Sequence, residues 1–219
     1  MIWIGEDIMQ KIDSYKTLEE AALEMGYPEV KVIPADDIVV EDRVRLKCIV
    51  GCPHYGKGLR CPPYTPSINE FRKILNDYSF AMLIKLKQPK ISNELKSKYN
   101  LNNLEELDRL QDRYDDVNKI SARLWSDFAV HYKNALMDLL ELEKAAFSMG
   151  YTFATLFFAG RCMLCEKCDV ETGMCRNPVI ARFSAEAMGI NLLKTAENAV
   201  MELNFDSSDS TGMALLLID

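Results

Sequence analysis

The chain has 219 residues, 48% of them hydrophobic, with seven cysteines and a net charge of −7 at pH 7. This length and apolar fraction support a core without disulfide staples and predict a single domain, residues 1–219. An acidic chain is unsuited to binding nucleic acid or an anionic membrane. Its start lacks a signal-peptide pattern, and no window approaches the about 20 apolar residues of a membrane span, so we expect a cytoplasmic protein with reduced thiols.

The elements predicted in the first part of the chain are a helix, two strands and a loop. Thr17–Glu20 matches a capping box, and the helix that it opens should end at residues 26–28, which contain glycine and proline. Residues 29–33 alternate like a strand, and residues 79–87 are apolar enough for a buried strand. The stretch 43–66 is rich in glycine and proline and predicts a loop.

The middle of the chain predicts an insert, a long helix and a strand. Residues 89–116 are highly charged and poor in aromatic residues, which indicates a solvated, partly helical insert. Apolar residues then recur at helical spacing from about residue 118 to Gly150, with His131 as a helix-packing residue. Residues 151–158 are rich in aromatic and β-branched residues and predict a strand.

Four short elements are expected towards the end of the chain: a helix from Pro178 to Gly189, a strand over residues 190–193, a helix capped by Thr195, and a strand over residues 213–218. Strands that alternate with helices predict an α/β or α+β fold, a small mixed sheet flanked by helices. We expect two cysteine-rich metal-binding loops at one end of that sheet.

The second group of cysteines reads C-x2-C-x2-C-x6-C and consists of Cys162, Cys165, Cys168 and Cys175. Its start matches the ferredoxin-type pattern for iron–sulfur ligation, although the last gap is six residues rather than three. Structural zinc sites usually pair two separated C-x2-C knuckles, so the run favours a [4Fe–4S] cluster and keeps zinc as the alternative. Arg161, Lys167, Arg176 and the start of the helix at Pro178 should offset the negative charge of the thiolates.

The first group offers three thiols, one fewer than a closed site needs: Cys48, Cys52 and Cys61. One interpretation is a cluster with one iron open to substrate, which would act as a Lewis acid. In the other, His54 or a residue distant in sequence fills the fourth position. Nearby cations, Lys57 and Arg60 among them, would hold a small anionic substrate or merely balance the charge of a cluster.

One further pair of charged residues follows the second group. Arg182 and Glu186 lie one turn apart on the predicted helix 178–189, which predicts an ion pair within that helix. Their closeness to the cysteines leaves a supporting role at the metal site open.

At both cysteine groups the chain resembles a family of predicted metal-binding proteins found in methanogenic archaea and other anaerobes. The hallmarks of that family are a front C-x3-C followed by C-P-P, a back A-G-x-C-x2-C-x2-C with C-x2-P, and S-x-E-A-x-G-I. In this chain they are residues 48–63, 159–178 and 184–190. The resemblance implies a metal, as iron–sulfur, at the seven cysteines and an anaerobic setting, and it brings no reaction with it.

The sequence therefore favours a cytoplasmic iron–sulfur protein that carries electrons on one or two [4Fe–4S] clusters and works with a redox partner protein. The first alternative is an enzyme whose open iron at the first cysteine group acts on a small anionic substrate. The second is a zinc-binding structural or interaction protein.

Overall fold

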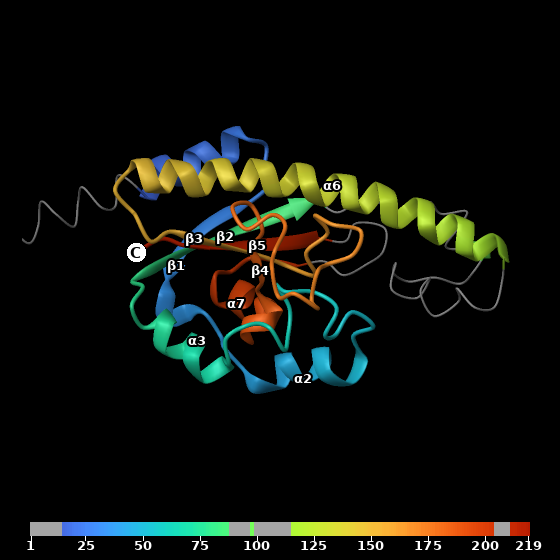
Figure 1. Cartoon of the computed structure of the whole chain (residues 1–219). Coiled ribbons are helices and arrows are strands. Elements are labelled where there is room, and N and C mark those ends of the chain that lie inside the picture. Colours follow the sequence, from blue (N-terminus) through green and yellow to red (C-terminus); the bar gives the residue numbers. More distant parts are fainter. Residues whose placement is uncertain (1–14, 88–96, 99–114, 204–210) are drawn as a thin grey trace, which may run out of the picture.

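The computed structural model describes residues 15–87, 97–98, 115–203 and 211–219, and these build a mixed sheet with helices on both faces (Figure 1). The strand order is β1-β2-β5-β3-β4, with antiparallel neighbours except for the parallel pair β3 and β4. The strands are β1 (Val30–Pro34), β2 (Phe80–Lys87), β3 (Thr155–Phe158), β4 (Phe183–Ser184) and β5 (Thr211–Leu217).

The first face of the sheet is covered by the helical residues 15–24 and by the long helix α6 (Asp115–Ser148). Apolar residues of α6 recur every three or four positions, which places them on one side of the helix. They pack on the alternate residues of the central strands that point the same way. The fully buried members on α6 are Leu136, Leu139, Leu142 and Ala146, and those on the strands are Met82, Ile84, Leu156, Ala214 and Leu216.

The second face carries α3 (Ile68–Leu75), α7 (Leu192–Asn198) and, at its margin, α2 (Asp42–Gly51), all on the side opposite α6 (Figure 1). Strand residues one position out of step with the first set fill this second core. They include Ala81, Leu83, Phe157, Met213, Leu215 and Leu217, against which Phe71 and Met188 pack. Because both faces are buried, the central strands are almost continuously apolar.

Hydrogen bonds of Glu41 link the start of α2 to α7. Its carboxylate accepts hydrogen bonds from Arg43 at 2.8 and 2.9 Å, from Asn191 Nδ2 at 2.7 Å and from Lys194 Nζ at 2.8 Å. Its backbone N–H donates to the carbonyl of Gly189 at 2.8 Å. The hydrogen bonds from Arg43, Lys194 and Asn191 lower the pKa of Glu41 to about 2.

Most of the predicted long elements are confirmed. The strands predicted over 29–33, 79–87 and 213–218 match β1, β2 and β5, and the long helix matches α6. The first helix ends near Gly26 as expected, but it already includes residues 15 and 16, so Thr17 does not begin it. Of residues 151–158, only the last four form the strand β3. Almost all of the predicted insert 89–116 lies outside the described residues.

Other predictions are wrong. The stretch 43–66 is not a loop throughout, because α2 occupies its first part and none of the residues of α2 is buried, so no apolar periodicity revealed it. Residues 190–193 form no strand. Ile190 makes an isolated bridge to Val40, and α7 begins directly afterwards with Asn191 rather than Thr195 as its cap.

The helix predicted from Pro178 to Gly189 is also wrong. One helical hydrogen bond forms, from the N–H of Ala181 to the carbonyl of Asn177. The guanidinium of Arg182 then donates hydrogen bonds to the carbonyls of Val179 and Ala181, at 2.9 and 3.2 Å. The chain continues from there into β4. Only the short 3-10 helix η2 (Glu186–Met188) follows, and it does end at Gly189 with a positive φ of 80°.

Candidate metal centre

The first cysteine group is built on the end of α2 and the loop behind it. Cys48 lies in the last two turns of α2, and Cys52 is the residue at which that helix ends. A spacing of four residues puts both on one side of the helix. Cys61 follows in the loop towards α3 and is partly buried, whereas Cys52 is exposed.

These three thiols lie close enough together to influence one another electrostatically. Burial, as the largest cause, and the neighbouring negative groups of Cys48, Cys52 and Glu186 together raise the pKa of the Cys61 thiol to about 12. Burial, Cys52 and Glu186 likewise raise the pKa of Cys48, against the opposing effect of Arg45. The three thiols of the first group are therefore neighbours in the structure, and Glu186 lies near Cys48 and Cys61.

The second cysteine group lies on the connection from β3 to β4. Burial raises the pKa of the Cys162 thiol, and Cys165 and Cys175 are near enough to raise it as well. The Cys162 sulfur also takes part in hydrogen bonds with the backbone N–H of Leu164 and the hydroxyl of Tyr132, a buried residue on α6. Two donors thus lie near this sulfur.

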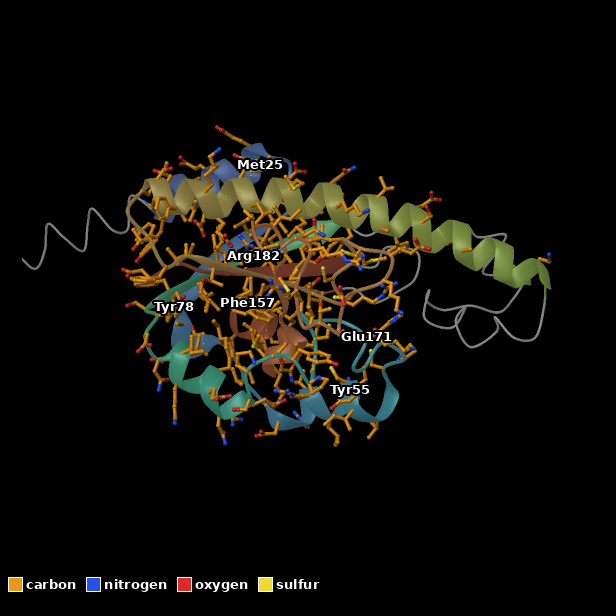
Figure 2. All side chains as sticks on the ribbon, in the orientation of Figure 1. Met25, Tyr55, Tyr78, Phe157, Glu171 and Arg182 are labelled. Atoms are coloured by element: carbon orange, nitrogen blue, oxygen red, sulfur yellow. The ribbon has the colours of Figure 1, made fainter. Side chains whose placement is uncertain are left out.

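The two cysteine groups touch each other although they lie about a hundred residues apart in the sequence. The backbone N–H of Cys162 donates to the sulfur of Cys61. The backbone N–H of Leu59 donates to the sulfur of Cys168 at 3.5 Å. The loop that follows α2 and the connection from β3 to β4 approach one another on the side of the sheet where Figure 2 shows Tyr55 and Glu171. The seven cysteines form one region rather than two remote sites.

Two of the predicted sources of positive charge, Arg176 and a helix at Pro178, do not compensate the thiols as expected. Arg176 pairs with Asp169 at 3.6 Å, and no helix starts at Pro178 to direct its positive end at the sulfurs. Hydrogen bonds to sulfur take that role instead. Besides the N–H groups named above, the side-chain amide of Asn177 donates to Cys165 Sγ at 3.1 Å. Such bonds stabilise thiolates and tune the potential of a cluster that they hold.

The three residues predicted as a fourth ligand or an anion clamp take different positions. Lys57 is exposed and His54 is partly buried. The guanidinium of Arg60 lies over the ring of Phe183, 4.9 Å from its centroid. The Nε atom of Arg60, the residue before Cys61 in the sequence, is buried and has no hydrogen-bond acceptor among the described residues. A buried donor of this kind is suited to an inorganic sulfide or another anion held at the cysteines.

The predicted ion pair between Arg182 and Glu186 does not form. Arg182 reaches instead to α6, where Nε donates to Glu143 Oε2 at 2.9 Å and Nη2 donates to Glu143 Oε1. Figure 2 shows Arg182 at the level between α6 and the sheet. The carboxylate of Glu186 accepts from Ser184 Oγ at 2.8 Å and from the N–H of Gly160 at 3.1 Å. The sequence placed Glu186 on the wrong element, which hid its position beside the first cysteine group.

The donor set decides which metals fit. All seven cysteines are described and all are free thiols, the ligands that select zinc, copper(I) and iron–sulfur clusters. Within the described part of the chain, no three His, Cys, Asp or Glu side chains are gathered closely enough to hold one metal ion. A mononuclear site would bring the sulfurs to about 3.8 Å from one another, from Zn–S bonds of about 2.3 Å in a tetrahedron, and would require them to move together.

Residues 31–218 match a family described as "Predicted metal-binding protein (DUF2284)", and the match includes all seven cysteines. The chain belongs to this family. No curated protein and no solved structure matches the chain. Among the described helices, none has the length and apolar content needed to cross a bilayer.

Proposed function

We propose that this member of the family is a cytoplasmic iron–sulfur protein that transfers electrons, in an anaerobic setting. One [4Fe–4S] cluster would be held by Cys162, Cys165, Cys168 and Cys175, and a second centre by Cys48, Cys52 and Cys61. When bound, the clusters would supply one-electron redox chemistry. The residues of the chain bind them, shield them and tune them.

The contact between the two cysteine groups carries the proposal. Cys61 and Cys162 are joined by a hydrogen bond from backbone to sulfur, and so are Leu59 and Cys168. Two centres held by these residues would be adjacent, which suits the passage of an electron from one to the other. A purely structural zinc site gains nothing from such closeness.

Burial and hydrogen bonding support the same function. The Cys61 and Cys162 thiols are raised in pKa by burial, and sulfurs of both groups accept backbone or side-chain donors. Solvent exposure and hydrogen bonds to sulfur are two of the factors that set the potential of a cluster. The unpartnered Nε of Arg60, which precedes Cys61 in the sequence, is a further buried donor that a cluster sulfide could satisfy.

The proposal is tested by measuring iron, zinc and acid-labile sulfide on protein purified without oxygen. Two [4Fe–4S] clusters would give about eight iron and about eight sulfide per chain. Cys165→Ala and Cys61→Ala should each lose about half of both while the other centre keeps its electron paramagnetic resonance signal. Met174→Ala is the matched control, because Met174 is an exposed sulfur-containing residue in the same connection and is not a thiol.

Colourless protein that contains zinc and no sulfide would contradict the proposal and favour the structural zinc protein. A single set of about four iron that either cysteine variant abolishes completely would replace two centres with one shared centre. That outcome would keep the iron–sulfur assignment and change the number of clusters.

The redox partner that we propose docks at the exposed side of α2 and carries an acidic surface. Leu46, Ile49 and Val50 of α2 are between 53% and 75% exposed, next to Cys48 and Cys52. Lys47 is exposed on the same helix and Lys57 is exposed in the loop that follows it, and neither forms an ion pair among the described residues. An apolar patch with a basic rim fits an acidic partner.

Two small acceptors of opposite charge test this surface. Oxidation of the reduced protein by anionic ferricyanide should slow in Lys47→Glu, whereas oxidation by cationic cobalt(III) hexammine should become faster, and both differences should fade at high salt. Lys31→Glu on β1 is the control for a change of net charge alone. Equal effects of Lys47→Glu and Lys31→Glu would refute docking at α2.

A further inference from the structure

Glu186 is held in place by one of its two carboxylate oxygens. Oε2 accepts hydrogen bonds from Ser184 Oγ at 2.8 Å and from the backbone N–H of Gly160 at 3.1 Å. Among the described residues, no hydrogen bond reaches Oε1 and no cation forms an ion pair with this carboxylate. One oxygen is therefore fixed and the other is available.

The surroundings of Glu186 are the elements that carry the first cysteine group. The 3-10 helix η2, which Glu186 begins, packs against α2, on which Cys48 lies. The N–H of Ser184 donates to the carbonyl of Arg60 at 3.3 Å, and Arg60 directly precedes Cys61. The charge of Glu186 accordingly acts on both Cys48 and Cys61.

As anions, the three sulfurs and this carboxylate would repel one another. Arg45 is the cation that acts on Cys48, but its Nη1 is committed to the carbonyl of Pro66 at 2.8 Å. Partly buried anions are stabilised by a positive centre between them, and a metal provides one. A fixed carboxylate with a free oxygen has the chemistry of a metal ligand.

We propose that Glu186 is the fourth protein ligand of the centre held by Cys48, Cys52 and Cys61, an inference that rests on the proposed function. The sequence analysis considered His54 or a residue distant in sequence for this position, and Glu186 is such a distant residue. Carboxylate oxygen is a harder donor than thiolate, so the iron that it binds should be released more readily than iron bound by cysteine. Glu186 would occupy this ligand position in the resting protein, and another ligand could displace it.

The variant Glu186→Gln isolates ligation from positioning. Its amide oxygen can still accept from Ser184 and Gly160, but its negative charge is gone. Glu186→Cys restores an anionic ligand of the type found at the other three positions. Ser184→Ala removes one of the bonds that hold the carboxylate and leaves the ligand itself, and His54→Ala tests the ligand predicted from the sequence.

Each variant is oxidised with ferricyanide without oxygen, with a ferrous chelator present. One electron passes from the cluster to ferricyanide and one Fe²⁺ leaves, which converts [4Fe–4S]²⁺ to [3Fe–4S]⁺. Iron release and the paramagnetic signal of the product report the same step. We expect Glu186→Gln to lose this iron about tenfold faster than the unchanged protein, Glu186→Cys to lose it more slowly, and His54→Ala to match the unchanged protein.

Equal rates for the unchanged protein and Glu186→Gln, with the cluster present in both, would overturn the ligand assignment and leave the iron–sulfur function intact. Acceleration by His54→Ala alone would overturn it in favour of His54. Protein without sulfide would show that the proposed function has failed. Cobalt(II) then replaces the cluster as the probe, and an unchanged ligand-field spectrum in Glu186→Gln would overturn the assignment for a single-ion site too.

Discussion

Replacing Glu143 by alanine should destabilise the fold far more than replacing another glutamate of α6. Glu143 accepts three hydrogen bonds, two from Arg182 and one from the backbone N–H of Leu156 at 2.7 Å. The side chains of Glu143 and Arg182 are each 18% exposed, so the pair is largely shielded from water. Its loss leaves a buried cation and a buried N–H without their acceptor.

The magnitude follows from these two losses. Breaking a buried ion pair by removing one partner costs about 3–5 kcal/mol, and an unsatisfied buried donor costs about 1–3 kcal/mol. Because the pair retains some contact with water and the two losses share one side chain, we expect about 3–4 kcal/mol in total. Glu141→Ala is the control, since its partner Lys144 is 71% exposed and such a pair contributes at most about 1 kcal/mol.

Urea unfolding of both metal-free variants, followed by circular dichroism, measures the difference. With a slope of about 2 kcal/mol per molar urea, the midpoint of Glu143→Ala should fall by about 1.5–2 M, and that of Glu141→Ala by less than about 0.5 M. Equal shifts would refute the reasoning. The double variant Glu143→Leu with Arg182→Met should recover much of the lost stability, because it removes the unpaired charge along with the pair.

Three further predictions concern single residues. Gly189→Ala should lower the free energy of unfolding, measured with urea, by about 2–4 kcal/mol, and Gly26→Ala should lower it by about 1–2 kcal/mol. Both glycines have a positive φ, which strains alanine. At position 189 the added Cβ would also meet other atoms at 3.0 Å, whereas at position 26 it would meet none within 4 Å. Hydrogen bonding to Arg43 lowers the pKa of Glu41 from 4.5 to about 2. In metal-free protein, the difference in unfolding free energy between the unchanged protein and Glu41→Gln should therefore be complete above about pH 5 and disappear as the pH falls towards 2. A difference that does not change with pH would contradict this. Tyr132→Phe should keep the iron content and make the reduction potential more negative by tens of mV in redox titration, because a donor to a cluster ligand is lost; an unchanged potential would rule that donor out.

The sequence predicts the long elements because they bury continuous apolar surface. The strands β2 and β5 and the helix α6 follow patterns set by two cores, and each pattern is visible without the fold. The helix α3 carried a visible signal that our prediction did not use, the capping box of Ser67 and Glu70. The helix α2 is harder, because its residues are all at least partly exposed, and its clearest sign is the helical spacing of Cys48 and Cys52.

The candidate site could be predicted from the sequence only as a set of cysteines. Spacing groups Cys48 with Cys52 and Cys162 with Cys165, but it holds no information about contacts between residues a hundred positions apart. The hydrogen bond from Cys162 to Cys61 depends on how two connections meet in space. Helical spacing predicted that Arg182 pairs with Glu186, which is near it in the sequence. In the tertiary structure Arg182 pairs instead with Glu143 on α6.

The parallel pair of β3 and β4 explains how Glu186 reaches the cysteines. Parallel strands end at the same edge of a sheet, and here β3 runs into Gly160 and the second cysteine group while β4 runs into η2. The N–H of Gly160 and the carboxylate of Glu186 therefore meet at 3.1 Å, although 26 residues separate them. Ligands in sheets with parallel strands gather at such carboxyl ends. The two family motifs A-G-x-C and S-x-E-A each lie at the end of one of these strands, so the fold brings both motifs to the same end of this pair.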